Sequence, residues 1–244
     1  MEYEIPKEGY LPFLSEPITI HWGNHAILMF VLWFILVPAM ILLLRFGKVR
    51  PTTYGMKGGI PKFSRPEFPW TMHKIVLYTM IILAIGGVCF AMLLSGGFSG
   101  TMHSYFGLAT LILGLLQGVS AWFRGTHGGQ RGSEADQEDR SSWGGDHFDM
   151  TPRRWWFEAY HKTAGYFVLF CAGGAVATGL AQYWMPGIAI AFVVVVLFGL
   201  ICAIVLQGSG RNHDTYTSVY GYHPEHPFNK RRFQSMIRSR RDEP

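Results

Sequence analysis

The chain has 244 residues, of which 49% are hydrophobic and only 15% are charged, and its formal net charge is +5. A soluble domain usually has about 25% charged residues, so the composition argues against a soluble protein. The three cysteines all lie in apolar stretches, which excludes a disulfide framework, and no C-x-x-C-H motif for covalent haem attachment is present.

Five stretches without a charged side chain are long enough to cross the roughly 30 Å of bilayer hydrocarbon as helices. They are residues 26–44, 75–94, 105–123, 164–185 and 188–206. We therefore predict an all-α integral membrane protein with five transmembrane helices. We divide the chain into an N-terminal tail (1–20), a transmembrane domain (21–206) with a polar inner loop (124–158), and a basic C-terminal tail (207–244).

Basic side chains predict the orientation, because lysine and arginine concentrate in cytoplasmic loops. The N-terminal tail has one lysine and four glutamates, whereas the segment after the first span and the C-terminal tail are strongly basic. We therefore expect the N-terminus outside and the C-terminus in the cytoplasm. The net positive charge is explained by these basic cytoplasmic segments, so it is not evidence for a nucleic-acid partner. Near the end of the polar loop, Thr151 and Pro152 predict the N-cap and the first residue of the fourth helix.

Four of the ten histidines lie at or just before the starts of the first four spans: His25, His73, His103 and His161. An ionisable side chain at membrane depth is costly and marks a candidate functional site. Successive spans alternate in direction. His25 and His103 are therefore expected near the outer face, and His73 and His161 near the inner face.

Two histidine pairs, one in each leaflet, match the axial ligands of two b-type haems. A zinc site takes more ligands than a pair supplies, and a proton relay adds buried carboxylates, which the spans lack. We predict a four-helix di-haem bundle made by the first four spans, with the fifth span as a peripheral packing helix. His21 lies one helical turn before His25 and is the alternative ligand, or a hydrogen-bond donor to a haem propionate.

Haem propionates need cations or hydroxyl groups beside them. Arg45 and Lys74 are the main candidates near the inner face, and Ser104 is the candidate near the outer face. Further candidates are Arg153, Arg154 and Lys162 on the inner side, and Trp22, Thr101 and Tyr105 on the outer side. Glycines in spans 2 to 4 allow a flat macrocycle to approach the backbone, although they equally allow helices to approach each other.

The segments around the four histidines resemble the core helices of the cytochrome b561 family. The matching segments are HAILMFVLWFILVP, WTMHKIVLYTMIILAIGG, MHSYFGLATLILGLLQ and RRWWFEAYHKTAGYFVLFCAGGAVATGL, within roughly residues 21–184. The resemblance implies two b haems, with ligands from helices 1 and 3 on one side and helices 2 and 4 on the other. The chain differs from the family pattern in its helices, because one predicted helix follows the core and none precedes it. It also has Ala26 at a position where the family frequently has glycine. We interpret the chain as a form without the DOMON domain, in a bacterial inner membrane.

The sequence thus predicts transmembrane electron transfer through two bis-histidine b-type haems, by an electron carrier or transmembrane oxidoreductase. The expected partners are membrane lipid and a redox protein or quinol. Two alternatives remain open. One is an accessory or quinone-reactive haem b anchor subunit of a larger membrane redox complex. The other is a non-redox structural subunit.

Overall fold

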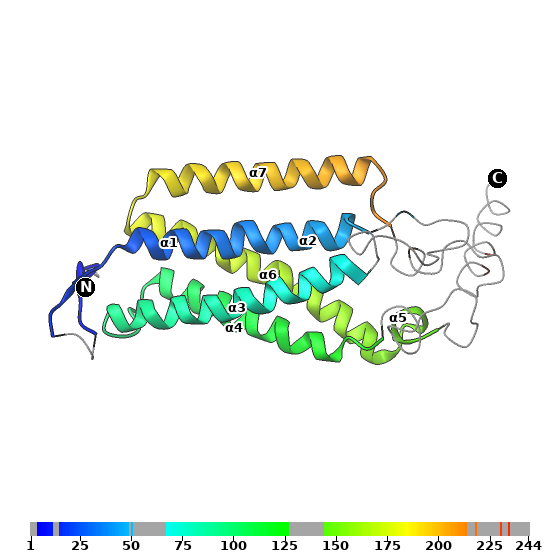
Figure 1. The fold of residues 1–244 in the computed structure, drawn as a ribbon, viewed down its shortest axis with the longest axis horizontal. Helices are drawn as coiled ribbons and strands as arrows, with labels where there is room; N and C mark the ends of the chain where they lie inside the picture. The colour runs from blue at the N-terminus through cyan, green and yellow to red at the C-terminus, as the bar shows by residue number, and fades with distance from the viewer. Residues whose placement is uncertain are drawn as a thin grey trace. The chain divides into compact units, whose positions relative to one another are not determined.

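The computed structural model describes residues 4–11, 15–48, 50, 67–126, 144–213, 218, 230 and 234 (Figure 1). Five helices in this part of the chain are long and apolar enough to cross a membrane. They are Trp22–Phe46, Phe68–Leu94, Met102–Phe123, Pro152–Gln182 and Pro186–Gly208. The prediction of five helical spans is confirmed. Residues 127–143 of the polar loop and most of the C-terminal tail beyond residue 213 lie outside the described residues.

The first span contains a π-helical segment. It consists of α1 (Trp22–Phe30), η1 (Val31–Leu36) and α2 (Val37–Phe46), without a break between them. Pro38 explains the wider turn, because proline has no N–H and its ring clashes with the carbonyl four residues earlier. In η1 the Val37 N–H bonds to the Leu32 carbonyl, five residues back, which is the spacing of a π-helix.

The later helices extend beyond the apolar stretches. They are α3 (Glu67–Leu94), α4 (Met102–Ser120) with a 3-10 turn η3 (Ala121–Phe123), α6 (Pro152–Gln182) and α7 (Pro186–Gly208), with a short α5 (Asp146–Asp149) before α6. Thr151 caps α6 as predicted, since the Arg154 N–H lies 3.4 Å from the Thr151 hydroxyl.

The fourth span was expected to reach residue 185, and this boundary is wrong. The α6 helix ends at Gln182. Pro186 starts α7 and disfavours helical backbone at the residue before it, so the connection takes up residues 183–185.

The N-terminal tail contains a small β-structure that the all-α prediction did not include. Strands β1 (Glu8–Gly9) and β2 (Ile18–Thr19) pair antiparallel, with Gly9 opposite Ile18. The Trp22 indole donates a hydrogen bond of 2.7 Å to the Pro6 carbonyl. This bond ties the tail to the start of α1.

The chain forms two compact units. The first unit comprises Met1–Ile41, His73–Val119 and Tyr160–Ala203, and the second comprises Leu42–Met72, Ser120–Ala159 and Ile204–Pro244. In the first unit, consecutive spans run in opposite directions (Figure 1). The core of this unit lies between η1, α3 and α6, where Leu32, Met80 and Ala84 are almost fully buried.

The α7 helix is peripheral. It has no buried residue, and Phe192 makes an edge contact with Phe34 of η1 at 4.8 Å between ring centroids. Large apolar side chains along it are exposed, among them Ile190 and Phe198 at 66% each. A surface this apolar is suited to contact with lipid chains rather than with water.

Candidate functional site

Two of the four predicted histidines face each other in the first unit. His25 is the fourth residue of α1, and His103 is the second residue of α4. Their ring centroids are 6.3 Å apart, and the ring planes cross at 80°. The predicted outer pair is therefore brought together by the fold. His21 is instead the exposed N-cap residue of α1, so the geometry favours His25 over His21 as the partner of His103.

The separation of the two rings fits an iron between them. A metal–imidazole bond is about 2.0 Å long and the ring centre lies about 1.1 Å behind the bonding nitrogen, so two axial rings have centroids about 6 Å apart. A direct ring stack would bring the two centroids closer than this. The donor set, two imidazoles without a carboxylate or thiol between them, matches a haem iron better than zinc.

A backbone carbonyl of a neighbouring helix holds the His103 ring. The Nδ1 atom of His103 lies 2.8 Å from the Ala175 carbonyl oxygen on α6. A carbonyl that accepts the Nδ1 proton fixes the ring's orientation and leaves Nε2 as the metal-binding atom.

A cavity of about 240 Å³ lies between the spans of the first unit, and both histidines line it. Its other walls are mainly aromatic and aliphatic, and include Trp22, Met29, Trp33, Phe98 and Leu111. Such walls exclude water and lower the local dielectric constant around a cofactor. The cavity therefore has the apolar surroundings that a b-type haem needs.

Glycine leaves the space that the His103 ring occupies. A Cβ atom built on Gly179 would lie 2.8 Å from the Nδ1 atom of His103, closer than real Cβ contacts. Gly107 also lines the cavity, and a Cβ atom there would meet nothing within 4 Å. The glycines of α4 and α6 thus have different roles, and only Gly179 is required by the position of the histidine.

The outer hydroxyl groups already have local partners. The Ser104 hydroxyl donates to the Thr101 carbonyl at 2.7 Å, and the Ser104 N–H donates to the Thr101 hydroxyl at 3.3 Å. Thr101 is thus the N-cap of α4. Ser99 and Ser104 both line the cavity, and Ser99 is a residue that the sequence reading missed. The role of Ser104 beside a propionate stays a prediction.

The predicted second pair, His73 and His161, stays a prediction, and the structure shows only how far along its helix each residue lies from the first pair. The Nδ1 atom of His73 on α3 lies 3.4 Å from the Met40 carbonyl oxygen. Met40 follows His25 by fifteen residues on the first span, which is roughly 20 Å of helix. His161 precedes Ala175, the partner of His103, by fourteen residues on α6, which is again roughly 20 Å. His73 and His161 therefore lie at matching distances from the outer pair.

The predicted inner cations divide between the two units. Lys74 and Lys162 belong to the first unit, and both are exposed. Arg45 belongs to the second unit and donates to the Gln207 side chain at 3.2 Å. Arg153 also lies there and donates to the Phe123 carbonyl at 3.0 Å. The binding of haem propionates by these four cations stays a prediction.

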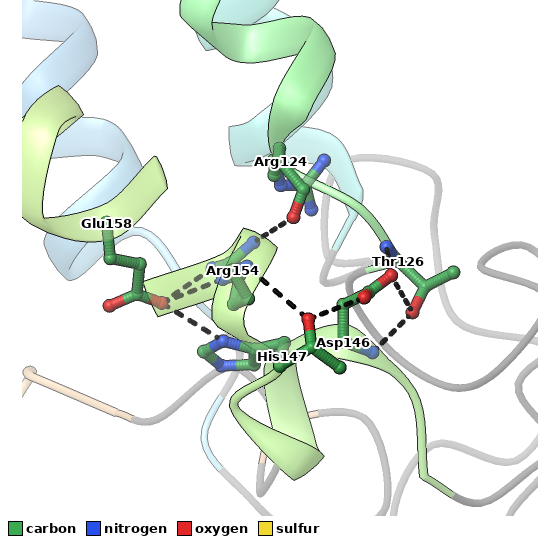
Figure 2. A network of polar contacts seen from close by, with 7 residues as sticks. Arg124, Thr126, Asp146, His147, Arg154 and Glu158 are labelled. Carbon is green, nitrogen blue, oxygen red and sulfur yellow. Dashed lines mark hydrogen bonds and ion pairs between the residues drawn. The ribbon is translucent and has the colours of Figure 1, made fainter. Parts of the chain in front are cut away.

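The second unit contains a polar network that the sequence reading did not predict (Figure 2). The Nε and Nη2 atoms of Arg154 donate to one Glu158 carboxylate oxygen at 2.9 and 2.8 Å, and Nη1 donates to the Arg124 carbonyl at 3.3 Å. His147 Nδ1 lies 3.3 Å from the same carboxylate oxygen. Arg154 is only 5% exposed. Arg154 therefore links the end of the third span to the start of the fourth through buried hydrogen bonds.

Arg124 is a second cation of this network. Its guanidinium lies over the Trp70 ring, 4.3 Å from the centroid. Burial, with a smaller contribution from neighbouring Arg154, lowers the pKa of Arg124 to about 9. The contact with the indole face offsets part of the cost of burying this charge.

Asp146 joins the two described ends of the polar loop. Its carboxylate accepts hydrogen bonds from the Thr126 N–H at 2.9 Å and the Thr151 hydroxyl at 2.7 Å. These hydrogen bonds hold the pKa of Asp146 below its ordinary value of 3.8, and the bond from the Thr126 N–H has the largest effect.

A lowered carboxylate pKa stabilises the fold at pH values above the ordinary pKa, and this contribution is lost as the pH falls through the lowered pKa. We expect the Tm of Asp146→Asn to lie below that of the parent at pH 6, and the difference to shrink towards pH 3. Thermal unfolding in detergent at both pH values measures it. The same Tm difference at both values would contradict the assignment. The effect is small, because the carboxylate is only partly buried and water screens its interactions.

Metal-binding clusters of the zinc type are not found in the described residues, where no group of three or more His, Cys, Asp or Glu side chains could hold an ion. The candidate site consists of His25, His103, the Ala175 carbonyl and the apolar cavity. Comparison of the chain with family models, with curated proteins and with solved structures gives no match.

Proposed function

We propose that the protein transfers electrons across a membrane through two b-type haems, one held by His25 and His103 and the other by His73 and His161. The observation that carries the proposal is the facing of the His25 and His103 rings at 6.3 Å between centroids, beside a largely apolar cavity. Bis-histidine haem of the cytochrome b561 type is the cofactor that this arrangement fits best.

A bound haem supplies one-electron redox chemistry at its iron, and the chain determines how that iron is held. The Ala175 carbonyl orients His103 and increases the basicity of its ring, which would favour the oxidised state of a bound haem iron. Gly179 leaves room for the ring. Trp33 and the other apolar walls keep water away from the site.

The roughly 20 Å of helix between the levels of the two proposed pairs supports transfer across the bilayer rather than within one leaflet. On this proposal the N-terminus is outside and the C-terminus is in the cytoplasm of a bacterial cell. The donor and acceptor are a quinol or a redox protein, one on each face.

The test is the haem content of the purified protein. We expect two b haems per chain by the pyridine haemochrome assay, and one in each of the variants His25→Ala, His73→Ala, His103→Ala and His161→Ala. His21→Ala is the matched control, because His21 lies one helical turn from His25 and is exposed. It should retain both haems and the parent spectrum.

The alternatives give different results. A parent protein that is helical by circular dichroism but binds no haem after expression with haem supplied would contradict the proposal and leave a structural subunit. If His21→Ala lost a haem and His25→Ala kept both, His21 rather than His25 would be the haem ligand. Two haems together with quinol oxidation only in the presence of a co-purified dehydrogenase would identify an anchor subunit.

A further inference from the structure

The ends of α2 and α7 are joined in the second unit by two hydrogen bonds between residues distant in sequence. The Arg45 guanidinium donates to the Gln207 side chain at 3.2 Å. Two residues beyond the end of α2, the Lys48 ammonium donates to the His213 carbonyl at 3.1 Å. The residues that follow each helix are therefore held together and form one surface.

This surface is basic. Within the part of the chain that the structure describes, three cations act on the His213 ring, namely Arg211, Arg50 and Lys48. Burial of the ring and then these three charges hold the pKa of His213 below its ordinary value. Among the described residues, the buried Nε2 atom of His213 has no hydrogen-bond partner. Arg45 adds a further cation beside the same helix ends.

The basic surface begins where two apolar helices end. Residues 186–206 contain no charged side chain, and Ile204 and Val205 in the last turns of α7 are 70% and 61% exposed. Cations that directly follow such a stretch lie at the level of the lipid headgroups. A ligand of this surface thus meets positive charge at one end and an apolar helix at the other.

We propose that Arg45, Lys48, Arg50, Arg211 and His213 form a binding site for the phosphate group of an anionic phospholipid, whose acyl chains begin beside the exposed Ile204 and Val205 side chains. Phosphate oxygens accept charge-assisted hydrogen bonds from the planar guanidinium groups. Basic clusters at the cytoplasmic ends of membrane helices attract anionic headgroups. The exposed Ile204 and Val205 side chains favour a lipid over free phosphate.

The experiment measures lipid binding to the full chain in a neutral detergent. Phosphatidylglycerol should bind saturably, as followed by native mass spectrometry, and should raise the Tm. Phosphatidylcholine at the same concentration should do neither. In Arg50→Gln/Arg211→Gln we expect phosphatidylglycerol to bind at least tenfold more weakly. The double variant Arg50→Lys/Arg211→Lys should recover part of the binding, because it restores the charge without the guanidinium geometry.

The charge-matched control is Lys7→Gln/Lys230→Gln, which removes two positive charges that are not among the proposed ligands and should bind phosphatidylglycerol like the parent. Equal weakening in this control would overturn the site, since general charge would then explain the binding. Equal binding of phosphatidylcholine would overturn it as well. If inorganic phosphate raised the Tm as much as phosphatidylglycerol does, the lipid would be overturned as the ligand and the site would be one for free phosphate. Haem content is read in every sample and is expected to be unchanged in both double variants with glutamine, so this test is independent of the haem proposal.

Discussion

Gly179→Ala is expected to lose the haem held by His25 and His103 while keeping the other. The new Cβ atom would lie 2.8 Å from the Nδ1 atom of His103 and 3.1 Å from its Cε1 atom. The ring is held against the Ala175 carbonyl at 2.8 Å, so it cannot move away without breaking that bond. The haem content should fall from two to about one per chain, measured by the pyridine haemochrome assay.

The control is Gly173→Ala, on the same helix, where a Cβ atom would meet nothing within 4 Å. Alanine is the better helix former by about 1 kcal/mol at either position, so weakening of the helix cannot explain a loss of haem. Gly173→Ala should retain both haems and the parent spectrum. Two haems and an unchanged spectrum in Gly179→Ala would show that His103 is not the ligand in this position.

Arg154→Met is expected to cause the largest loss of stability in the second unit, about 2–4 kcal/mol in the free energy of unfolding. The substitution removes a cation that lies 2.8 Å from Glu158, whose side chain is only 17% exposed, and so removes charge compensation from a partly buried carboxylate. It also removes the donor to the Arg124 carbonyl. Thermal unfolding in detergent, followed by circular dichroism, measures the loss.

Arg153→Met is the matched control. Arg153 also donates to carbonyls at the end of the third span, Phe123 and Trp122, but its side chain is exposed. Its loss should cost about 1 kcal/mol or less, because water replaces the lost hydrogen bonds. Arg154→Met/Glu158→Gln should recover part of the stability, since no buried charge then remains unpaired. A Tm for Arg154→Met equal to that of Arg153→Met would show that Arg154 does not stabilise the link between the third and fourth spans.

Several features followed from the sequence alone. The five spans were predictable because crossing a bilayer depends on the length and polarity of each segment, which are local properties. The start of α6 at Thr151 and Pro152 was predictable for the same reason, since an N-cap acts within one helical turn. The pairing of His25 with His103 followed from alternating helix direction, because consecutive spans cross a bilayer in opposite directions.

Other features depended on the tertiary structure. The sequence left His21 and His25 as alternatives, and only the packed helices bring His25 rather than His21 to His103. The carbonyl that orients His103 comes from Ala175, 72 residues away, and no local pattern identifies it. Arg154 was read as a haem-propionate candidate, whereas the fold surrounds it with Glu158 and the Arg124 carbonyl.

The difference has a physical cause. Hydropathy, capping and positive charge act on a segment through its own composition, so the sequence by itself determined the number of spans, their approximate limits and the candidate histidines. Contacts between side chains depend on the rotation and depth of each helix about its own axis. These are set by packing, such as that of Trp33 against Gly114 or of Phe106 against Gly174, and only the tertiary structure decides them.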